Sequence, residues 1–486
     1  MEILMAVDVG TSRTKVAIYD ANGKVVYKDS ETHVSNGGIT EQDPNVWWEE
    51  TVRLIKKVIS QTNLKPHVIG LSGNMHALLP VDGKGDPVRK AILWNDTRTE
   101  QEAHILKKRF GEDELINRFL NIPIPGFPLS KIIWMKEQER ELYEKTYKFI
   151  QPKDFIAFKL CGEIFTDYSD ASGTFAFNIR KKWWDEEILR ELKIDPSKFP
   201  DVVGSFTKIG SVSKEISYEL SLLEGTPVVI GAGDLITSAV GSGVDEESIA
   251  LVVGTAGQVI TISRDVFSDI LGKIFVFLHT DPDTFLYLGT VPAGGHSCEW
   301  FARRILKISL KEFFDLAERS PKGSNGLIFL PFIQGSGTPF MNYEVRGSFH
   351  NLSDTTTCED FCRATIEGIV FSLKASMDCM ENVLGKRKRL ILQSLAAREK
   401  VFLETIEGLH EGEILIPEDP DASLLGAAII AGVGIGIFRD LREGYKKMIK
   451  YTSTMRVSGM SNVLKEGYGT FINLVNHHIQ RRGDHG

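Results

Sequence analysis

Ile3-Leu4-Met5-Ala6-Val7-Asp8-Val9-Gly10-Thr11-Ser12 lies near the start of this 486-residue chain, and a second apolar run, Val16-Ala17-Ile18-Tyr19, follows it. The pattern predicts a strand, a tight glycine turn and another strand. Gly10 has no side chain, so backbone N–H groups can approach an anion there, and the Asp8 carboxylate suits hydrated Mg²⁺. The hairpin is therefore a candidate site for a metal-bound phosphate group. Because Asp and Gly also favour turns, an ordinary β-hairpin is the alternative interpretation.

A similar pattern recurs halfway along the chain. Residues 226–230 form an apolar run that leads into Gly231-Ala232-Gly233-Asp234, and Gly254-Thr255-Ala256-Gly257 separates two further apolar runs. Because strand and helix signals alternate throughout, the sequence predicts an α/β protein. Each half contains a strand, a Gly-Thr turn and a strand, which indicates duplicated domains that face one nucleotide. We expect these domains to cover residues 1–242 and 243–486.

Composition excludes several classes of function. The net charge of −8 provides no basic excess for nucleic acid or for an anionic membrane surface. The longest apolar stretch, Ala427 to Phe438, is short and contains three glycines, so it does not predict a membrane span. Five cysteines without metal-ligand spacing predict thiols in a reducing compartment. With no signal peptide visible, we expect a cytoplasmic protein.

Asp234 is the candidate general base. It directly follows a strand in a glycine-rich loop, where a carboxylate can accept the proton of a hydroxyl that attacks a phosphate. The alternative interpretation is an N-cap for the next helix, because Asp favours that position. The sequence has no Walker A pattern and no G-x-G-x-x-G, so the glycine turns are the candidate phosphate-binding elements.

Two polar loops are candidates for ligand binding. Ser72-Gly73-Asn74-Met75-His76 follows an apolar run, and a lone histidine there is more often structural than a ligand contact. Leu93-Trp94-Asn95-Asp96-Thr97-Arg98 combines an indole, an amide, an acid and a base. Such a loop suits a polyhydroxylated ligand, with the indole covering a sugar face. A surface turn with a local Asp–Arg pair is the alternative.

Taken in order, these segments resemble the motifs of the FGGY family of carbohydrate kinases, and within it those of the xylulokinases. The resemblance runs almost end to end and rests on six segments. They are Asp8–Ser12, Ser72–His76, Leu93–Thr99, Asp167–Thr174, Gly231–Asp234 and Leu425–Ala428.

The resemblance implies an α/β fold of two ribonuclease-H-like, actin-like ATPase domains that flank a central cleft. It implies ATP and Mg²⁺ as cofactors, a small sugar as the acceptor and a homodimer as the assembly. Asp8 would bind the metal, and Met75, His76 and Asp234 would bind the sugar, with Asp234 as the catalytic base. The residues implied for nucleotide binding are Thr11, Gly254, Thr255, Gly295 and Ala396.

Two segments depart from the family pattern. Ser394-Leu395-Ala396-Ala397-Arg398 stands where members carry G-G-G-A beside the adenosine, and Gly335-Ser336-Gly337-Thr338-Pro339 stands where they carry G-E-R-x-P. Leucine in place of glycine reduces the room for a nucleoside. We expect an ATP-dependent kinase that converts D-xylulose to D-xylulose 5-phosphate. The alternatives are a gluconokinase, an L-ribulokinase, a non-catalytic sugar or nucleotide sensor, and a filament-forming actin relative that would have no use for the sugar motifs.

Overall fold

A computed structural model describes residues 2–33, 40–457 and 459–483. Its residues form two compact units. The first contains Met1–Gly243, Val276–Leu286 and Asp421–Lys450, and the second contains Val244–Phe275, Tyr287–Pro420 and Tyr451–Gly486. The units are therefore not the two contiguous halves, residues 1–242 and 243–486, that the sequence predicts. Residues 276–286 and 421–450 follow residue 242 in the chain but belong to the first unit.

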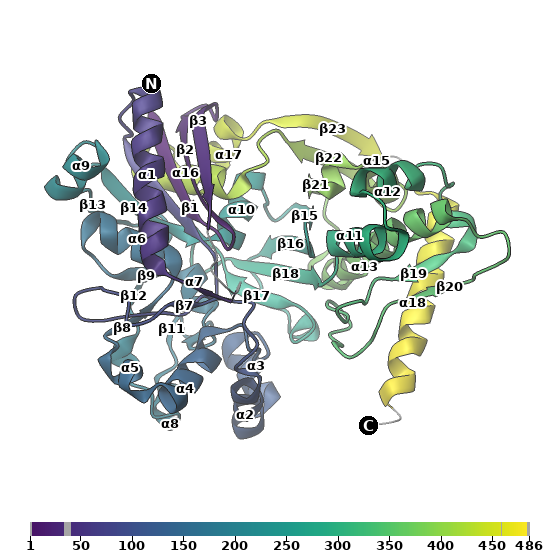
Figure 1. Ribbon diagram of the computed structural model, residues 1–486, viewed down its shortest axis with the longest axis horizontal. Coiled ribbons are helices and arrows are strands. Elements are labelled where there is room, and N and C mark those ends of the chain that lie inside the picture. Colours follow the sequence, from purple (N-terminus) through teal and green to yellow (C-terminus); the bar gives the residue numbers. More distant parts are fainter. Residues whose placement is uncertain (1, 34–39, 458, 484–486) are drawn as a thin grey trace. The chain divides into compact units, whose positions relative to one another are not determined.

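The first unit is built on a six-stranded sheet (Figure 1). Its strand order is β13-β14-β5-β1-β2-β3. These strands are β1 (Ile3–Val9), β2 (Arg13–Asp20), β3 (Val25–Thr32), β5 (Val68–Gly73), β13 (Lys208–Ser211) and β14 (Pro227–Gly233). β1 and β2 form the expected antiparallel hairpin, while β5 lies parallel to both β1 and β14.

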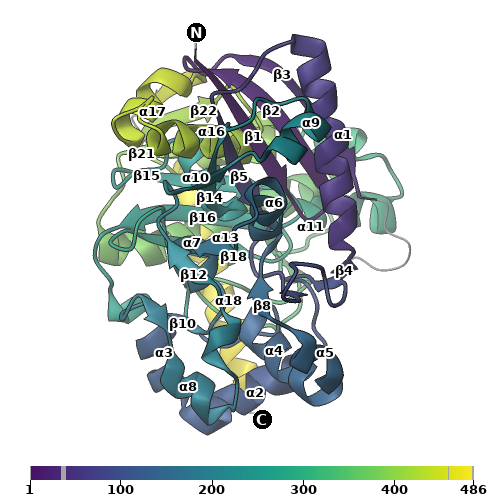
Figure 2. The same cartoon turned by 90° about the vertical axis from the view of Figure 1, so that its left-hand side faces the viewer.

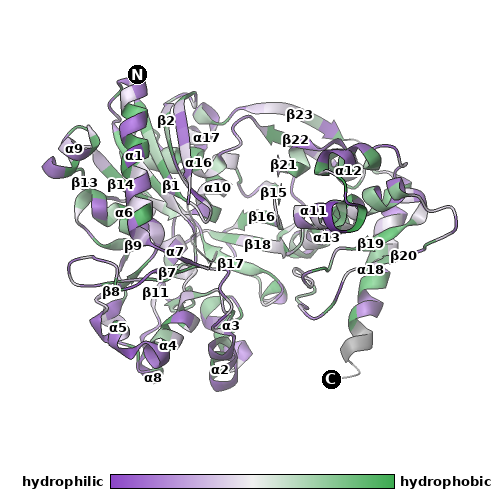
Figure 3. Cartoon of the chain, in the orientation of Figure 1, coloured by the Kyte–Doolittle hydropathy of each residue, from purple (hydrophilic) through white to green (hydrophobic). Residues whose placement is uncertain are grey.

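Both faces of β1 are buried because helices cover the sheet on each side. Alternate residues of a strand point to opposite faces. Ile3, Met5, Val7 and Val9 share a core with α1 (Pro44–Thr62) and α6 (Pro152–Cys161). α1 lies along β2 and β3 (Figure 2), and it carries both hydrophobic and hydrophilic residues (Figure 3). The opposite face of β1, which includes Asp8, is covered by α16 (Ala422–Gly434).

Two glycines allow α16 to approach α10 (Asp234–Ser242) closely. A Cβ atom on Gly426 would lie 1.8 Å from the Thr237 carbonyl oxygen, and one on Gly241 would lie 1.9 Å from the Ala422 carbonyl oxygen. Any larger residue would force the helices apart. The Leu425–Ala428 motif therefore has a structural role. Its Gly426 allows α16 to pack closely against α10, the helix that begins at Asp234.

The second large sheet has seven strands in the order β17-β18-β16-β15-β21-β22-β23. Strand β17 (Phe275–Leu278) lies at its edge, and the six other strands repeat the order of the first sheet. They are β15 (Ser248–Val253), β16 (Gly257–Ser263), β18 (Phe285–Val291), β21 (Arg389–Ser394), β22 (Gly412–Pro417) and β23 (Tyr451–Val457). β15 pairs antiparallel with β16 and parallel with β21, as β1 does with β2 and β5. The duplication expected from the two Gly-Thr turns is confirmed by this shared topology.

The remaining elements surround these two sheets. In the first unit they are α2 (Glu100–Phe110), α3 (Glu112–Phe119), α4 (Pro128–Gln138), α5 (Arg140–Lys145), α7 (Tyr168–Ser172), α8 (Glu186–Glu191), α9 (Lys214–Leu220), α17 (Leu441–Met448), and the short strands β4 (Glu41–Gln42), β6 (Leu79–Val81), β7 (Ala91–Ile92), β8 (Lys148–Ile150), β9 (Phe165–Asp167), β10 (Phe177–Asn178), β11 (Trp183–Trp184) and β12 (Asp201–Val203). In the second unit they are α11 (Gly295–Trp300), α12 (Leu310–Ala317), α13 (Cys358–Leu384), α14 (Leu395–Arg398), α15 (Lys400–Glu407), α18 (Asn462–Gly483), β19 (Ile328–Leu330) and β20 (Ser348–His350). Within the described residues, no helix has the length and apolar character needed to cross a membrane.

Candidate active site

Asp8 lies at the end of β1 in a polar setting that three elements create. The hairpin register places Lys15 of β2 directly opposite Asp8, and Lys15 Nζ lies 3.1 Å from Asp8 Oδ2. Ser423, at the start of α16, donates a hydrogen bond of 2.7 Å to the same oxygen. Asp8 Oδ1 is buried and has no hydrogen-bond partner within the described part of the chain. This remaining oxygen fits Mg²⁺, which proteins hold through one or two carboxylates together with phosphate oxygens and water.

Lys15 and Ser423 are site residues that the motif analysis missed. Burial lowers the pKa of Lys15, but the charges of Asp8 and Asp421 outweigh it, so the pKa of Lys15 is raised and the side chain is cationic. Counting along the hairpin could have found Lys15, because a cross-strand neighbour follows from the register. Ser423 is 415 positions from Asp8. No local sequence pattern predicts the contact between Ser423 and Asp8.

Asp234 is the first residue of α10, and its side chain does not cap the helix. Gly233 occupies the N-cap position, so the interpretation of Asp234 as an N-cap is wrong. Instead, Asp234 Oδ1 accepts a long hydrogen bond of 3.4 Å from the Met75 backbone N–H. Burial, reinforced by the negative charge of Asp8, raises the pKa of Asp234 to about 7. A carboxylate with such a pKa can accept and release a proton near neutral pH.

Met75 and His76 form a turn beyond β5 that is held from several sides. His76 has a φ of 64°, a left-handed conformation that few non-glycine residues adopt. Its Nδ1 lies 2.8 Å from the Gly173 carbonyl oxygen. Burial lowers the pKa of His76 to about 4, so the ring is neutral at pH 7. Because a carbonyl oxygen can only accept, Nδ1 carries the proton and Nε2 is left as an acceptor for a ligand hydroxyl.

Gly173, in the Asp167–Thr174 motif, is needed for this turn. A Cβ at Gly173 would lie 2.7 Å from His76 Nδ1 and 3.2 Å from Met75 Cε. The His76 ring also packs at centroid distances of 5.1 and 5.2 Å from Phe127 and Phe277. The turn is therefore fixed by packing on both of its residues, as a ligand-binding turn requires.

The Leu93–Arg98 loop contains the local ion pair that the sequence offers as an alternative. Arg98 Nη2 lies 2.7 Å from Asp96 Oδ2, and the guanidinium stacks over Trp134 at 5.1 Å. Trp94 is 50% exposed, and its Nε1 donates a 3.1 Å hydrogen bond to Thr11 Oγ1. The indole thus lies against the first Gly-Thr turn. Its expected contact with a sugar face stays a prediction.

In the second unit, the structure brings together the residues expected at the nucleotide. Gly254 and Thr255 form the turn between β15 and β16, and α11 begins at Gly295 beside it. Gly295 N donates to the Gly254 carbonyl oxygen at 2.8 Å, and His296 N donates to the Thr255 carbonyl oxygen at 3.0 Å. A Cβ at Gly295 would lie 2.6 Å from that Gly254 oxygen, so only glycine fits this approach.

The two departures from the family pattern also lie in the second unit. Leu395 Cδ1 would lie 2.7 Å from a Cβ at Gly295, so Leu395 fills space beside the Gly254 turn. The side chain of Ala396 is fully buried, so a nucleotide could meet only its backbone. The Gly335–Pro339 segment is held against the end of β18, because Thr338 N donates to the Thr290 carbonyl oxygen at 2.9 Å. A Cβ at Gly337 would lie 2.1 Å from the same oxygen.

The duplicated sheets, the paired Gly-Thr turns and the carboxylate at the start of α10 define the two-domain fold of sugar kinases and actin-like ATPases. Models of the N-terminal and C-terminal domains of the FGGY family of carbohydrate kinases match residues 3–241 and 249–435. The chain therefore belongs to the FGGY family of carbohydrate kinases, and it is a phosphotransferase.

Individual relatives are similar over nearly their whole length. The chain is 32% identical to a xylulose kinase of Staphylococcus xylosus, over 96% of this chain and 100% of the relative. It is 31% identical to a gluconokinase of Bacillus subtilis, over 97% of this chain and 95% of the relative. The crystal structure of a ligand-bound xylulose kinase from Lactobacillus acidophilus matches with a TM-score of 0.90 at 25% identity, covering 100% of this chain and 98% of that one.

Proposed function

We propose that this carbohydrate kinase transfers the γ-phosphoryl group of ATP to D-xylulose, with Asp234 as the general base. The observation that carries the proposal is the position and the pKa of Asp234. It begins α10 after a buried strand, contacts the Met75–His76 turn, and has a pKa of about 7 because of burial and Asp8. Family membership and the presence of both carboxylates favour an enzyme over a non-catalytic sensor.

The proposed mechanism assigns each step to residues of the chain. His76 Nε2 accepts a hydrogen bond from a sugar hydroxyl. The backbone around Met75 holds the sugar beside Asp234. Asp234 takes the proton of the attacking hydroxyl as the new P–O bond forms and ADP leaves. Asp8 Oδ1 and the phosphates of ATP would hold Mg²⁺, which neutralises phosphate charge when it is bound. Thr11, Gly254, Thr255, Gly295 and the backbone of Ala396 are the proposed nucleotide contacts.

The lysines around the Met75–His76 turn already have partners in the protein, which favours a neutral ketose over gluconate as the substrate. A sugar carboxylate would need a lysine or arginine, yet the nearby lysines are engaged. Lys15 pairs with Asp8, and Lys131 Nζ donates to the carbonyl oxygens of His76 at 2.7 Å and Gly126 at 2.8 Å. Lys153 pairs with three aspartates. Similarity to xylulose kinases supports the same choice.

A substrate panel tests this choice. ADP release should be measured by a coupled assay with D-xylulose, L-ribulose and gluconate under the same MgATP concentration. We expect D-xylulose to have the highest kcat/KM. A higher kcat/KM with gluconate would favour the gluconokinase alternative, and one with L-ribulose would favour the ribulokinase alternative.

The pH dependence of kcat/KM reports the base of the free enzyme. With a pKa of about 7, Asp234 is protonated in acid, so kcat/KM should fall up to about tenfold per pH unit below that value. The positive charge of Lys15 lowers the pKa of Asp234. Lys15→Met should therefore move the acidic limb to higher pH, while Lys15→Arg keeps the charge and should leave the limb in place. Identical profiles for Lys15→Met and the wild type would contradict this electrostatic coupling.

Gly295→Ala tests the nucleotide side. The added Cβ would meet the Gly254 carbonyl oxygen and Leu395, so the turn must shift. An overpacked contact costs about 1–3 kcal/mol, and we expect the KM for ATP to rise by about tenfold or more. Gly469→Ala is the matched control, because no atom lies within 4 Å of its added Cβ. The assignment fails if both variants have the KM of the wild type for ATP.

A further inference from the structure

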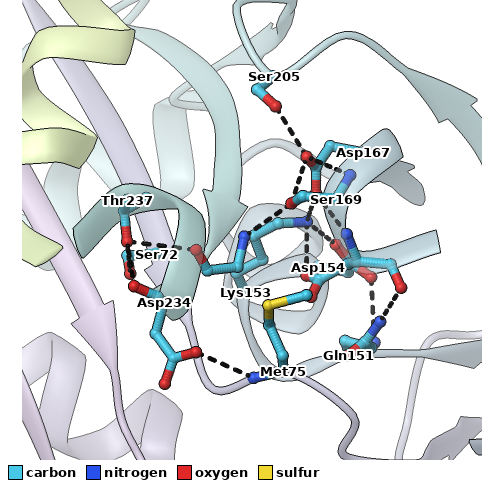
Figure 4. A network of polar contacts seen from close by, with 12 residues as sticks. Ser72, Met75, Gln151, Lys153, Asp154, Asp167, Ser169, Ser205, Asp234 and Thr237 are labelled. Atoms are coloured by element: carbon cyan, nitrogen blue, oxygen red, sulfur yellow. Dashed lines mark hydrogen bonds and ion pairs between the residues drawn. The ribbon is translucent and has the colours of Figure 1, made fainter. Parts of the chain in front are cut away.

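A buried charge cluster lies next to Met75 and the start of α10 (Figure 4). Lys153, in the first turn of α6, is its centre. Its Nζ lies 2.6 Å from Asp154 Oδ1, 3.0 Å from Asp167 Oδ1 and 3.0 Å from Asp170 Oδ2. The four side chains are at most 1% exposed. The proposed chemistry uses none of these groups, so their arrangement needs another explanation.

One arm of the cluster leads to Asp234. Asp167 Oδ2 accepts a 2.7 Å hydrogen bond from the Ser169 hydroxyl. The oxygen of that hydroxyl accepts a 3.0 Å hydrogen bond from the backbone N–H of Gly233. Gly233 is the N-cap of α10 and directly precedes Asp234. Ser169 therefore fixes the Ala232–Gly233 peptide unit, which directly precedes the proposed base.

A second arm leads to the turn opposite the base. Asp154 Oδ2 accepts a 3.0 Å hydrogen bond from the Gln151 backbone N–H. Gln151 Oε1 in turn accepts a 2.8 Å hydrogen bond from the His76 backbone N–H. The same buried lysine thus anchors both the segment that carries Asp234 and the segment that carries His76.

The charge balance of the cluster restricts how it can rearrange. One ammonium faces three carboxylates, and burial, with the charges of Asp167 and Asp154 added, raises the pKa of Asp170 well above its ordinary value despite Lys153. A Cβ at Gly233 would lie 2.3 Å from Met75 Cγ and 2.9 Å from Asp170 Oδ1. Gly233 is therefore enclosed by Met75 on one side and by the cluster on another, so little movement is available to it.

We propose that Ser169 is a positioning residue for phosphoryl transfer, which holds Asp234 at the attacking hydroxyl by linking Gly233 to the Asp167–Lys153 pair. This inference rests on the proposed role of Asp234 as base. It adds a residue that acts on Asp234 through the backbone of Gly233, the N-cap of α10.

The test is a double-mutant cycle on the full-length protein. Ser169→Ala should lower kcat for D-xylulose by about 10- to 100-fold, because a small displacement of a catalytic group has effects of this size. The dissociation constant of D-xylulose, measured by calorimetry without nucleotide, should change by less than about threefold. In the Asp234→Asn background, Ser169→Ala should cause no further loss of kcat, since no base is left to position.

Ser205→Ala is the matched control. The Ser205 hydroxyl is equally buried and donates to the same Asp167 Oδ2 at 2.8 Å, but Gly233 is bonded to Ser169 instead. We expect Ser205→Ala to retain nearly the kcat of the wild type. Equal kcat values for the two serine variants would overturn the inference, and so would an equal effect of Ser169→Ala with and without Asp234.

Two further measurements keep the outcomes separate. If Ser169→Ala is unfolded, Asp167→Asn removes the charged acceptor of the same hydroxyl and takes its place in the cycle. The single variant Asp234→Asn reports on the base itself. Normal turnover of Asp234→Asn would contradict both the proposed base and any residue that positions it, whereas a severe loss there without coupling to Ser169 would overturn the positioning role alone.

Discussion

Asp234→Asn is expected to lower kcat by about 10²- to 10⁴-fold, the range that a general base typically contributes. Asparagine keeps the shape of the side chain and removes its ability to take the proton of the sugar hydroxyl. Sugar binding should change little, because Gly173 and Gln151 also hold the Met75–His76 turn, and asparagine keeps an oxygen that can accept from the Met75 N–H. Steady-state kinetics and calorimetry with D-xylulose measure the two quantities separately.

Asp20→Asn provides the control for this substitution. Asp20 belongs to the same unit, and its carboxylate caps the turn after β2 by accepting from the Asn22 and Lys24 backbone N–H groups. The variant should keep the kcat of the wild type. A normal kcat in Asp234→Asn, or equal losses in the two variants, would remove Asp234 from the mechanism.

Lys153→Met should produce the largest change in stability. It leaves three buried carboxyl groups without their cation, and breaking a buried ion pair in this way costs about 3–5 kcal/mol of the free energy of unfolding. Burial already raises the pKa of Asp154 and Asp170 in the folded protein. Loss of Lys153 removes the charge that opposes this rise, so both groups should hold their protons to still higher pH.

The sign of the pH dependence follows from linkage. A carboxyl whose pKa is raised by folding loses stability as the pH rises above its ordinary value of 3.8, because only the unfolded chain releases the proton. The loss in the free energy of unfolding caused by Lys153→Met should therefore be small near pH 4 and grow towards neutral pH. Chemical denaturation of the wild type and the variant across this range measures it.

Lys131→Met is the control for this pH dependence. Lys131 is equally buried but donates to backbone carbonyl oxygens, and burial lowers its pKa to about 7. It is charged in both the folded and the unfolded state between pH 4 and 6, so its deficit should be flat there. If the stability loss of Lys153→Met were also independent of pH, the pKa values of the three carboxyl groups would not depend on Lys153.

Local patterns in the sequence predict the framework of the fold. The apolar runs around Asp8 and around Gly254 locate two hairpins, and the hairpins mark two sheets with the same order of strands. Hydrophobic periodicity and turn residues are local properties of the sequence, so they can be recognised without knowledge of the tertiary structure. Gly295 comes instead from the family resemblance. It lies beside Gly254, and its contact with a nucleotide stays a prediction.

Contacts between distant segments could not be predicted in this way. Residues 421–450 join the first unit because Gly426 and Gly241 let two helices meet, and this brings Ser423 to Asp8. The Lys153 cluster likewise depends on the ion pairs that α6 makes with β9 and α7. In the sequence, Lys153 and Asp154 resemble any pair in the first turn of a helix.

Transfer of labelled phosphate to D-xylulose tests the central claim most directly. Purified protein is incubated with Mg²⁺, γ-labelled ATP and D-xylulose, and the products are separated and identified by NMR. We expect one ADP for each D-xylulose 5-phosphate formed, with the label on the sugar, and almost no product from Asp234→Asn. ADP formation that does not depend on the sugar, or unlabelled D-xylulose after prolonged incubation, would contradict the account.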